Sequence, residues 1–420
     1  MSLPPRDLLR IATAGSVDDG KSTLIGRLLF DSRALYDDHL EALERARVES
    51  GAPALDLAML TDGLRAEREQ GITIDVAYRF FSTPTRRFVL ADTPGHEEYT
   101  RNMATGASNA DVAIILCDAS RGLTHQSRRH AAIAALLGVP HLIVCVNKMD
   151  LLGYDEAAFA AIRDAFVPAL AALGARAAHV IPISALHGDG IVTRSSAMGW
   201  YDGPTVMEAL ATAPPATAAV GPARFPVQLV VREATGATGR AYSGRVTSGA
   251  LAVGDAVAVM PAGQIASVAA ISTFDGDLPR ASAGQSITIT LDRDIDCARG
   301  DLIAAAADHP RALREFSAMV IWFSATPLTV GRPLLIKHTS RTTRAQVAAI
   351  DERVDMATLA RDPAAELRMN DIGRCRIRTA DLLAIDPYRR DRSTGSAILI
   401  DPATNDTVGA VIILTDEDEA

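Results

Sequence analysis

The sequence predicts an α/β domain with a mostly parallel sheet and helices on both faces, followed by two β-barrel domains. From residue 9 to about residue 210, apolar runs alternate with amphipathic stretches, which is the order of β-α-β units. Beyond residue 222 the apolar runs are short and are separated by glycine and aspartate, as in β-barrels. A chain of 420 residues also needs more than one hydrophobic core.

Within residues 1–210, the predicted first domain, strands and helices take turns. Buried strands are expected where apolar residues run together, at residues 9–14, 88–91, 112–117, 141–146 and 180–183. Helices are expected between them, at residues 21–30, 38–48, 96–107, 126–137 and 156–173. Residues 75–83 alternate and lead through a Pro-Thr turn into the next strand, which predicts one antiparallel edge hairpin. The charged run at residues 65–69 is expected on a solvated helix face.

The rest of the chain is divided by its composition. Residues 211–222 are rich in Ala, Pro and Thr and are predicted to be a linker. Short β-like runs follow at residues 225–232, 241–247, 256–260, 286–291, 318–323, 334–338 and 374–378. A boundary near Pro310 gives barrels at residues 223–309 and 310–414, each of ordinary domain size. Residues 415–420 are predicted to be a solvated acidic tail.

Composition and charge argue against several classes of protein. Hydrophobic residues make up 48% of the chain and charged residues 22%, as in a globular protein. No run of about 18 apolar residues occurs, and residues 1–10 lack the apolar stretch of a signal peptide, so neither a membrane span nor export is expected. A net charge of −9 argues against general affinity for nucleic acid. The four cysteines form no C-x-x-C pair, which predicts neither disulfides nor a zinc site and indicates the cytoplasm.

The basic residues are unevenly distributed between the two types. Of 42 basic residues only Lys21, Lys148 and Lys337 are lysines, so 39 are arginines. A lysine in such a chain either is left over by chance or marks a position where a compact ammonium is needed and a planar guanidinium does not fit. Two of the three lysines fall in the motifs described next, which favours the second interpretation.

A glycine-rich motif follows the first predicted strand and opens the first predicted helix. It fits the pattern G-x-x-x-x-G-K-[ST], in which glycines let the backbone wrap phosphates while amides and the helix N-terminus supply positive potential. Lys21 is expected to bridge the β- and γ-phosphates and Ser22 to bind Mg²⁺. A purely structural glycine turn is the alternative. The motif consists of Gly15, Ser16, Val17, Asp18, Asp19, Gly20, Lys21 and Ser22.

A second motif follows the predicted strand at residues 141–146 and is expected to recognise the base of a bound nucleotide. It consists of Asn147, Lys148, Met149 and Asp150. The Asp150 carboxylate can accept from guanine N1–H and the 2-amino group together, whereas adenine has neither donor and would leave it unpaired. Lys148 is expected to lie along the base, and Asn147 is expected to tie this loop to the phosphate loop. A backbone N–H on the guanine oxygen is expected from the segment after the next strand: Ser184, Ala185 and Leu186.

Two segments are expected to sense the γ-phosphate. One is Gly71-Ile72-Thr73, whose threonine hydroxyl can complete the Mg²⁺ shell. In the other, Asp92 can hold Mg²⁺ through water, the Gly95 amide can reach the phosphate, and His96 stands where a GTPase orients the attacking water. The alternatives are a strand-entry threonine for Thr73 and a helix-capping surface histidine for His96. The second segment consists of Asp92, Thr93, Pro94, Gly95 and His96.

These motifs therefore predict a P-loop GTPase domain with GTP and Mg²⁺ as its ligands. The catalytic candidates are His96, Lys21 and Thr73, and the metal candidates are Ser22, Thr73 and Asp92, the last through water. Loss of the γ-phosphate would release both sensing segments, which defines a two-state switch.

The sequence resembles the translation-factor class of GTPases, through residues 67–73, 92–96 and 102–107. Within that class it is most similar to the large, GTPase subunit of bacterial sulfate adenylyltransferase (the CysN type). That resemblance spans essentially the whole chain. It is carried by residues 15–22 with the paired Asp18-Asp19, and by residues 29–33, 62–64, 92–102, 385–388, 392–396 and 398–401.

The resemblance implies an elongation-factor-like architecture and a partner. In that family the GTPase pairs with a small catalytic subunit that makes adenosine 5′-phosphosulfate and pyrophosphate from ATP and sulfate, and GTP hydrolysis drives this unfavourable step. The chain contains no H-x-G-H motif, so adenylyl transfer is expected on the partner. The alternatives are an elongation factor that carries aminoacyl-tRNA and a stand-alone regulatory GTPase. Elongation factors usually have His where Asp19 stands, which counts against the first of these.

Overall fold

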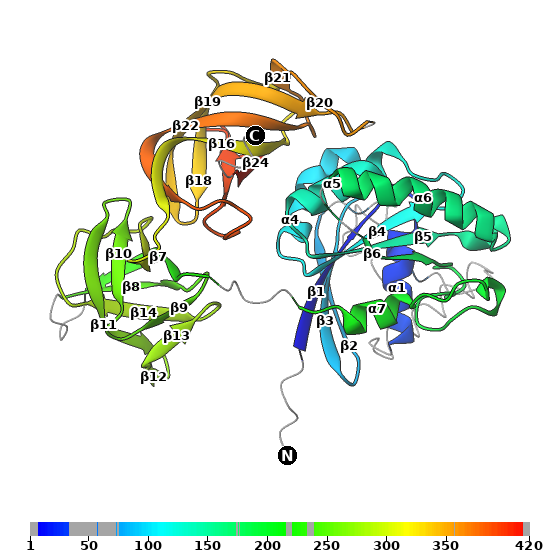
Figure 1. The fold of residues 1–420 in the computed structure, drawn as a ribbon, viewed down its shortest axis with the longest axis horizontal. Coiled ribbons are helices and arrows are strands. Elements are labelled where there is room, and N and C mark those ends of the chain that lie inside the picture. The colour runs from blue at the N-terminus through cyan, green and yellow to red at the C-terminus, as the bar shows by residue number, and fades with distance from the viewer. Residues whose placement is uncertain are drawn as a thin grey trace. The chain divides into compact units, whose positions relative to one another are not determined.

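The computed structural model describes residues 7–32, 57, 73, 75–173, 175, 177–215, 221–232, 239–356 and 358–414. The chain forms two compact units, one of Met1–Ala216 with Met356–Ala360 and one of Thr217–Asp355 with Arg361–Ala420 (Figure 1). Several sequence predictions fall outside the described residues: the helix at 38–48, the charged run at 65–69, Gly71, Ile72 and the tail at 415–420.

The first unit is built on a six-stranded sheet with the order β2-β3-β1-β4-β5-β6. Every neighbouring pair is parallel except the β2–β3 hairpin at the edge, so the predicted sheet and its antiparallel edge are confirmed. The strand β4 is buried along its whole length and is apolar up to its last residue, Asp118, as is typical of a central parallel strand covered on both faces. The strands are β1 Asp7–Ala14, β2 Ala77–Ser82, β3 Arg86–Asp92, β4 Val112–Asp118, β5 His141–Asn147 and β6 Ala177–Pro182.

Helices cover both faces of this sheet. Figure 1 shows α4, α5 and α6 on one side of it and α1 and α7 on the other. The helices are α1 Lys21–Asp31, α4 Thr100–Ser108, α5 His125–Leu136, α6 Glu156–Ala172 and α7 Val206–Thr212, with 3₁₀ turns η2 Glu97–Tyr99, η3 Met149–Leu152 and η4 Ser196–Met198. In such a sheet ligands bind beyond the carboxyl ends of the strands, which is where the predicted motifs lie.

The expected helix at residues 96–107 is wrong at its beginning. His96 has an extended backbone (φ −77°, ψ 143°) and caps the short turn η2, and α4 begins only at Thr100. The break occurs because Tyr99, the last residue of η2 and the N-cap of α4, has φ −105° and ψ 18°, outside α-helical geometry. His96 is therefore held in a loop at the end of β3 and not in a helix.

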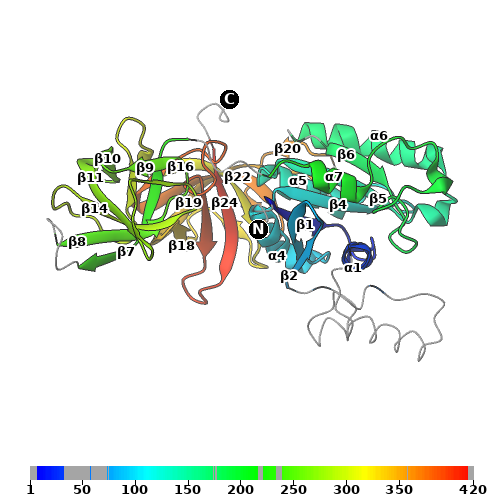
Figure 2. The ribbon, with the colours of Figure 1, turned by 90° about the horizontal axis from the view of Figure 1, so that it is seen from below.

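The second unit contains two closed β-barrels, which confirms the predicted architecture (Figure 2). In the first, β10-β15-β7-β8-β14-β11 form a ring that the β10–β11 pairing closes. In the second, the ring is β18-β23-β24-β16-β22-β19, closed by β18–β19. Each barrel surrounds its own core of buried aliphatic and aromatic side chains, with Phe225 and Tyr242 in the first and Trp322 in the second.

The barrel strands are as follows, and several are longer than the apolar runs that predict them. The first barrel and its flanking pairs use β7 Arg224–Arg232, β8 Arg240–Arg245, β9 Ala250–Ala252, β10 Ala256–Met260, β11 Gln264–Thr273, β12 Gly276–Asp277, β13 Arg280–Ser282, β14 Ser286–Leu291 and β15 Leu302–Ala305. The second uses β16 Arg311–Trp322, β17 Leu328–Thr329, β18 Pro333–His338, β19 Arg341–Val354, β20 Arg361–Asp362, β21 Glu366–Leu367, β22 Ile372–Ile385, β23 Ser396–Ile400 and β24 Thr407–Ile413. Lys337 is exposed on β18.

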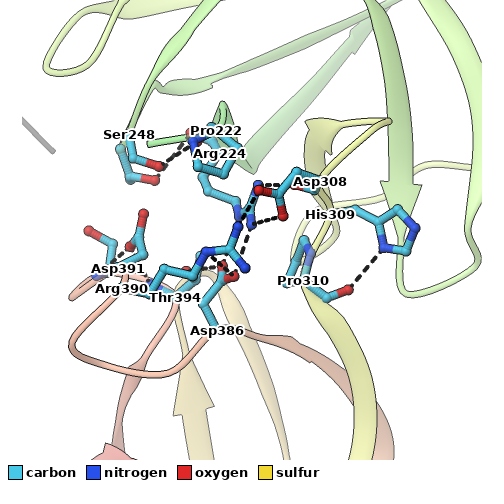
Figure 3. Close-up of polar contacts among 12 residues, drawn as sticks. Pro222, Arg224, Ser248, Asp308, His309, Pro310, Asp386, Arg390, Asp391 and Thr394 are labelled. Carbon is cyan, nitrogen blue, oxygen red and sulfur yellow. Dashed lines mark hydrogen bonds and ion pairs between the residues drawn. The ribbon is translucent and has the colours of Figure 1, made fainter. Parts of the chain in front are cut away.

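A buried ion pair joins the two barrels (Figure 3). Arg224 at the start of β7 donates from Nε and Nη2 to the two carboxylate oxygens of Asp386, at 2.7 and 2.9 Å. Both side chains are only 1% exposed. Thr394 Oγ1 donates to the same carboxylate at 2.7 Å, and Arg224 Nη1 donates to the Asp308 carbonyl at 2.7 Å. The charges are therefore fully hydrogen-bonded, as buried charges must be.

Two further structural properties concern membrane-spanning helices and the cysteines. Among the described residues, no helix combines the length and the apolar character needed to cross a membrane. All four cysteines are buried and free, and burial raises the pKa of the Cys117 thiol to about 12.

Candidate functional site

The phosphate loop lies between β1 and α1 and turns through left-handed backbone. Asp18 has φ 67° and Gly20, the N-cap of α1, has φ 91°. A Cβ atom on Gly20 would lie 2.3 Å from Asn147 Nδ2, so only glycine fits between this loop and the base loop. The loop thus has the close-wrapped shape that the sequence motif predicts, with the helix N-terminus behind it.

Lys21 is curled back into this loop. Its Nζ donates to the carbonyl oxygens of Gly15 at 2.9 Å and Ser16 at 2.8 Å. The residue is 7% exposed, and burial lowers the pKa of its ammonium, opposed by the nearby carboxylates of Asp19 and Asp92. The two carbonyls fix the ammonium at the floor of the loop, where it faces the space a phosphate chain would enter.

Asp19 stabilises the phosphate loop through its side chain and its backbone carbonyl. Its side chain is fully buried, Oδ2 accepts from the Ser16 amide at 2.7 Å, and its own carbonyl accepts from Asn147 Nδ2 at 2.8 Å. Burial raises the pKa of this carboxyl, and Oδ1 has no hydrogen-bond partner among the described residues. Asp19 therefore links the phosphate loop both to itself and to the base loop.

Asn147 ties the base loop to its surroundings, as the sequence predicts. Besides donating to Asp19, it accepts from the Ala185 amide through Oδ1 at 2.9 Å. That contact uses the Ala185 N–H, so within the segment 184–186 the Leu186 amide is the better candidate for the guanine oxygen. Leu186 is itself anchored, because its carbonyl accepts from Arg27 Nη2 at 2.7 Å.

Lys148 is fixed by a carboxylate that the motifs do not include. Its backbone is left-handed (φ 63°), and its Nζ lies 2.8 Å from Asp118 Oδ2 at the end of β4. Asp118 is 2% exposed, and its Oδ1 accepts from both the amide and the hydroxyl of Ser120. The neighbouring Met149 is fully buried, and Asp150 after it is half-buried at the start of η3. A lone aspartate ending a buried strand was the only sequence signal for Asp118.

The segment after β3 rests directly on the phosphate loop. Asp92 is 1% exposed, and the Thr93 hydroxyl donates to the Thr13 carbonyl. A Cβ on Gly95 would lie 2.3 Å from Lys21 Nζ and 2.8 Å from the Gly15 carbonyl oxygen, so this contact needs glycine. Pro94 is buried between these residues and completes the turn.

His96, next in the chain, is exposed and plays a local structural part. Its Nδ1 accepts from the Glu98 amide at 3.4 Å, and its ring centroid lies 5.9 Å from that of Tyr99. The capping role weighed as an alternative is thus present, and the same ring lines the cavity described next. The two roles are compatible, because capping uses Nδ1 and leaves Nε2 to face outward.

One cavity of about 350 Å³ brings most of these residues together. Its lining joins the phosphate loop, Thr73, the Gly95–His96 segment and Lys148, which are separated by up to 131 positions in the chain. Thr23, the second residue after the motif lysine, also lines it and is not part of the predicted set. The other described lining residues are Val17, Asp18, Gly20, Lys21, Ser22, Thr73, Gly95, His96 and Lys148.

The oxygen donors around this cavity suit a hard divalent cation. Ser22 and Thr73 contribute hydroxyls to the lining, and the Asp92 carboxylate is buried at the end of β3 behind them. Mg²⁺ prefers such oxygen ligands and keeps several waters, so the set does not need a cluster of protein carboxylates. In the part of the chain that the structure describes, no cluster of three or more His, Cys, Asp or Glu side chains could hold a metal by itself.

Comparison with known proteins identifies the domains. Residues 6–216 match the family model for the elongation factor Tu GTP-binding domain, and residues 315–414 match the one for the GTP-eEF1A C-terminal domain-like family. Among solved structures, Sup35 complexed with GDP aligns with 98% of this chain and 94% of its own, at 22% identity and a TM-score of 0.44. The family-model match over residues 6–216 shows that the first unit belongs to the elongation factor Tu GTP-binding domain family.

Full-length relatives narrow the assignment. The bifunctional enzyme CysN/CysC of Mycobacterium tuberculosis (strain ATCC 25618 / H37Rv) is 50% identical over 414 residues, which are 97% of this chain and 67% of that protein. Sulfate adenylyltransferase subunit 1 of Shewanella oneidensis is 48% identical over 98% of this chain and 86% of its own length. The resemblance seen in the sequence is confirmed: with this identity along nearly its whole length, the chain belongs to the sulfate adenylyltransferase subunit 1 family, transferase subunits with a GTP-binding domain.

Proposed function

We propose that this chain is the GTP-hydrolysing subunit of a heteromeric sulfate adenylyltransferase. GTP hydrolysis here would drive the synthesis of adenosine 5′-phosphosulfate and pyrophosphate from ATP and sulfate on a small catalytic partner subunit. The observation that supports GTP hydrolysis is that Lys21, Ser22, Thr73 and His96 line the same cavity. The similarity along 98% of the chain to a sulfate adenylyltransferase subunit 1 supports the synthetic half and speaks against an elongation factor.

In this proposal the phosphate loop, Gly15 to Ser22, binds the triphosphate. Its amides and the N-terminus of α1 face the phosphate oxygens, and Lys21 reaches the β- and γ-phosphates from its two carbonyl anchors. The Gly95 amide meets the γ-phosphate, because Gly95 already lies against Lys21. Ser22 and Thr73 would bind Mg²⁺ directly and Asp92 through water. When bound, the ion neutralises charge on the phosphate oxygens.

The base site provides the first prediction. Asp150 accepts two hydrogen bonds from guanine, Lys148 lies along the ring, and the Leu186 amide contacts the guanine oxygen. Asp150→Asn should lower GDP affinity by roughly 100-fold or more and raise relative affinity for xanthosine diphosphate, whose 2-oxo group accepts where guanine donates. Competition against a fluorescent GDP analogue by GDP, XDP and ATP measures this. Displacement of GDP by ATP from the unaltered chain at similar concentration would refute the guanine assignment.

The second prediction concerns His96. Phosphoryl transfer to water depends on placing the water in line with the γ-phosphate, and the exposed face of the His96 ring lines the cavity beside Gly95. His96→Ala should leave GTP affinity within a few-fold, because the phosphate, metal and base contacts are untouched. Hydrolysis should fall about 100-fold, or ~2.7 kcal/mol of transition-state stabilisation. Single-turnover hydrolysis with ³²P-labelled GTP measures it, and an unchanged rate would assign the water to another residue.

The partner is tested by capture and assay. The tagged chain is used to capture its binding partner, and the complex is assayed for sulfate-dependent pyrophosphate release with and without GTP. We expect a small nucleotidyltransferase subunit, GTP-stimulated release by the complex, and no adenylyl transfer by the chain alone. Capture of tRNA would favour the elongation-factor alternative, and adenylylsulfate formed by the purified chain alone would overturn the division of labour.

We further propose that the protein works in the cytoplasm and not on nucleic acid. Four free, buried cysteines suit a reducing compartment, and the net charge of −9 disfavours binding to a phosphate backbone.

A further inference from the structure

A buried polar network connects helix α5 to the segment that carries His96. Gln126 Nε2 donates to the Gly95 carbonyl at 3.4 Å and lies 2.9 Å from His130 Nε2. Arg129 Nη1 donates to Gln126 Oε1 at 2.9 Å and pairs with Glu97 Oε1 at 3.0 Å. Gln126 and Arg129 are each 8% exposed and His130 is fully buried, so the network lies in the interior of the unit.

Hydrogen bonding to the Arg129 guanidinium fixes the orientation of the Gln126 amide and, through it, the tautomer of His130. A guanidinium can only donate, so the oxygen of the Gln126 amide must face Arg129 and its NH₂ must face Gly95 and His130. His130 Nε2 is then an acceptor, which requires a neutral ring protonated on Nδ1. Burial lowers the pKa of His130 to about 3, with smaller contributions from Lys21 and Arg129, so the ring stays neutral at physiological pH. In this arrangement the His130 Nδ1–H has no hydrogen-bond partner among the described residues.

These contacts hold His96 on both sides. The Gly95 carbonyl that Gln126 binds belongs to the peptide whose nitrogen is that of His96, and Arg129 holds Glu97, the next residue. Among the described residues, the His96 side chain has the weak 3.4 Å capping contact with Glu98 and the Tyr99 ring to orient it. The backbone on either side is therefore what fixes where its ring can reach.

We infer that Gln126 and Arg129 are positioning residues for GTP hydrolysis, acting through His96. Neither is among the described residues that line the cavity, so both act by positioning His96 and not by binding the nucleotide. This inference rests on the proposed role of His96. A displacement of about 1 Å in a reacting group can cost up to 100-fold in rate, so the loss of such a clamp should appear in the chemical step.

The test replaces the amide by an apolar side chain of similar size, Gln126→Met, in the full chain. We expect single-turnover GTP hydrolysis to fall by roughly 10- to 100-fold, with GTP affinity within about two-fold of the original. His125→Ala, an exposed neighbour on the same helix, is the matched control and should change neither quantity. A Gln126→Met rate within about two-fold of the original would overturn the inference.

A double-mutant cycle with His96→Ala separates a positioning role from a structural one. If Gln126 acts through His96, Gln126→Met slows the unaltered chain but adds little in the His96→Ala background. Additive losses, or losses accompanied by weaker GTP binding, would mean a structural role and refute the inference. If His96→Ala itself hydrolyses GTP normally, the proposed role of His96 has failed, which is a different result from normal hydrolysis by Gln126→Met alone.

A second variant covers the case in which Gln126→Met does not fold. Glu97 is 57% exposed, so Glu97→Ala removes the outer anchor of Arg129 without opening the core. We expect hydrolysis to slow by about 2- to 5-fold, the scale of a half-exposed ion pair, and again only when His96 is present. No change in rate for Glu97→Ala would overturn the role of Arg129.

Discussion

At the scale of single residues, buried carboxylates set the geometry of the nucleotide site. Asp19 accepts from the Ser16 amide inside the phosphate loop, and Asp118 holds the Lys148 ammonium at 2.8 Å. Without that carboxylate, the long Lys148 side chain would have to be immobilised by the base alone, at a cost in side-chain entropy. In the proposed base site, Asp118 thus fixes the position of the Lys148 ammonium.

This leads to the third prediction. Asp118→Asn should weaken GDP binding by about 10-fold, because the charge-assisted hydrogen bond to Lys148 becomes a neutral one and the ammonium is less well held. Affinity is measured by fluorescent-nucleotide titration. Asp164→Asn changes an exposed carboxylate on α6 that pairs with its neighbour Arg163; it is the control and should bind GDP normally. Unchanged affinity in Asp118→Asn would show that the base orders Lys148 unaided.

The pH dependence of this pair follows from the direction of the Asp118 pKa. Burial raises the pKa, but hydrogen bonds from Lys148 and Ser120 outweigh burial and hold it below its ordinary value of 3.8. Because the pKa is lowered, the contribution to affinity is complete at neutral pH and is lost only as pH falls through that lowered pKa. GDP affinity should therefore be flat between about pH 6 and pH 8 as far as this pair is concerned.

Some residues of the site belong to contiguous sequence motifs and can be predicted from them, whereas others are brought there only by the fold. The phosphate loop and the base loop are contiguous motifs, and the structure places Lys21, Ser22, Gly95 and Lys148 around one cavity as their order in the chain suggests. Asp118 and the α5 network could not be predicted in this way. Their contacts exist because β4 lies beside β5 and α5 packs near β3's carboxyl end, and such neighbours are a property of the fold.

At the scale of elements, the beginning of α1 depends on Gly20. The residue caps the helix at φ 91°, a conformation that costs other residues about 1 kcal/mol or more, and a Cβ there would lie 2.3 Å from Asn147 Nδ2. That nitrogen makes the hydrogen bond to the Asp19 carbonyl. One glycine therefore allows both the helix N-terminus and the tie between two loops.

The fourth prediction is that Gly20→Ala lowers GDP affinity at least about 10-fold, because the methyl group displaces Asn147 and opens the loop. Isothermal titration measures it. Gly254→Ala is a matched control, since Gly254 has φ 93° with nothing within 4 Å of the added methyl. It should cost about 1 kcal/mol of stability and leave GDP binding unchanged. Equal affinity of the Gly20→Ala chain would show that the loops yield without loss.

Regular elements are predictable where their periodicity is strong. The alternation of apolar runs and helices predicts β1, β4 and β5 within a residue or two. The signal is strongest in β4 and β5, where no polar residue stands between the first and last positions, as in parallel strands covered on both faces. The strand β19 has no such run: its exposed face carries Arg344 and Gln346 between short buried residues. The beginning of α4 is missed because the Tyr99 backbone, which no residue pattern marks, breaks the helix.

At the scale of the whole molecule, the Arg224–Asp386 pair is one of the buried contacts that join the two barrels. Burial raises the pKa of Asp386, but the hydrogen bonds from Arg224 and Thr394 outweigh it and hold the pKa below its ordinary value. The lowered pKa means that the stabilisation is present at neutral pH and is lost as pH falls through the lowered pKa. Acid should therefore loosen this joint before it unfolds either barrel core.

The fifth prediction is that Arg224→Met destabilises the second unit by about 3–5 kcal/mol, because Asp386 is left as an unpaired buried charge. Urea unfolding followed by Trp322 fluorescence, in a Trp200→Phe background, reports on that unit alone, since Trp322 is fully buried in β16. Arg378→Met breaks an exposed pair with Glu315 and should cost at most about 1 kcal/mol. A similar midpoint for both variants would mean that solvent enters the barrel joint.

The environments of the three lysines also determine which cross-linking reagents can map a complex of this chain with a partner. Lys21 is buried and Lys148 is held by Asp118, so of the three lysine side chains only Lys337 is freely open to an amine-reactive cross-linker. Such reagents would return almost no distance restraints for a complex of this chain, however tightly a partner binds. With 51 acidic residues, carbodiimide or hydrazide coupling through carboxylates covers the surface far more densely.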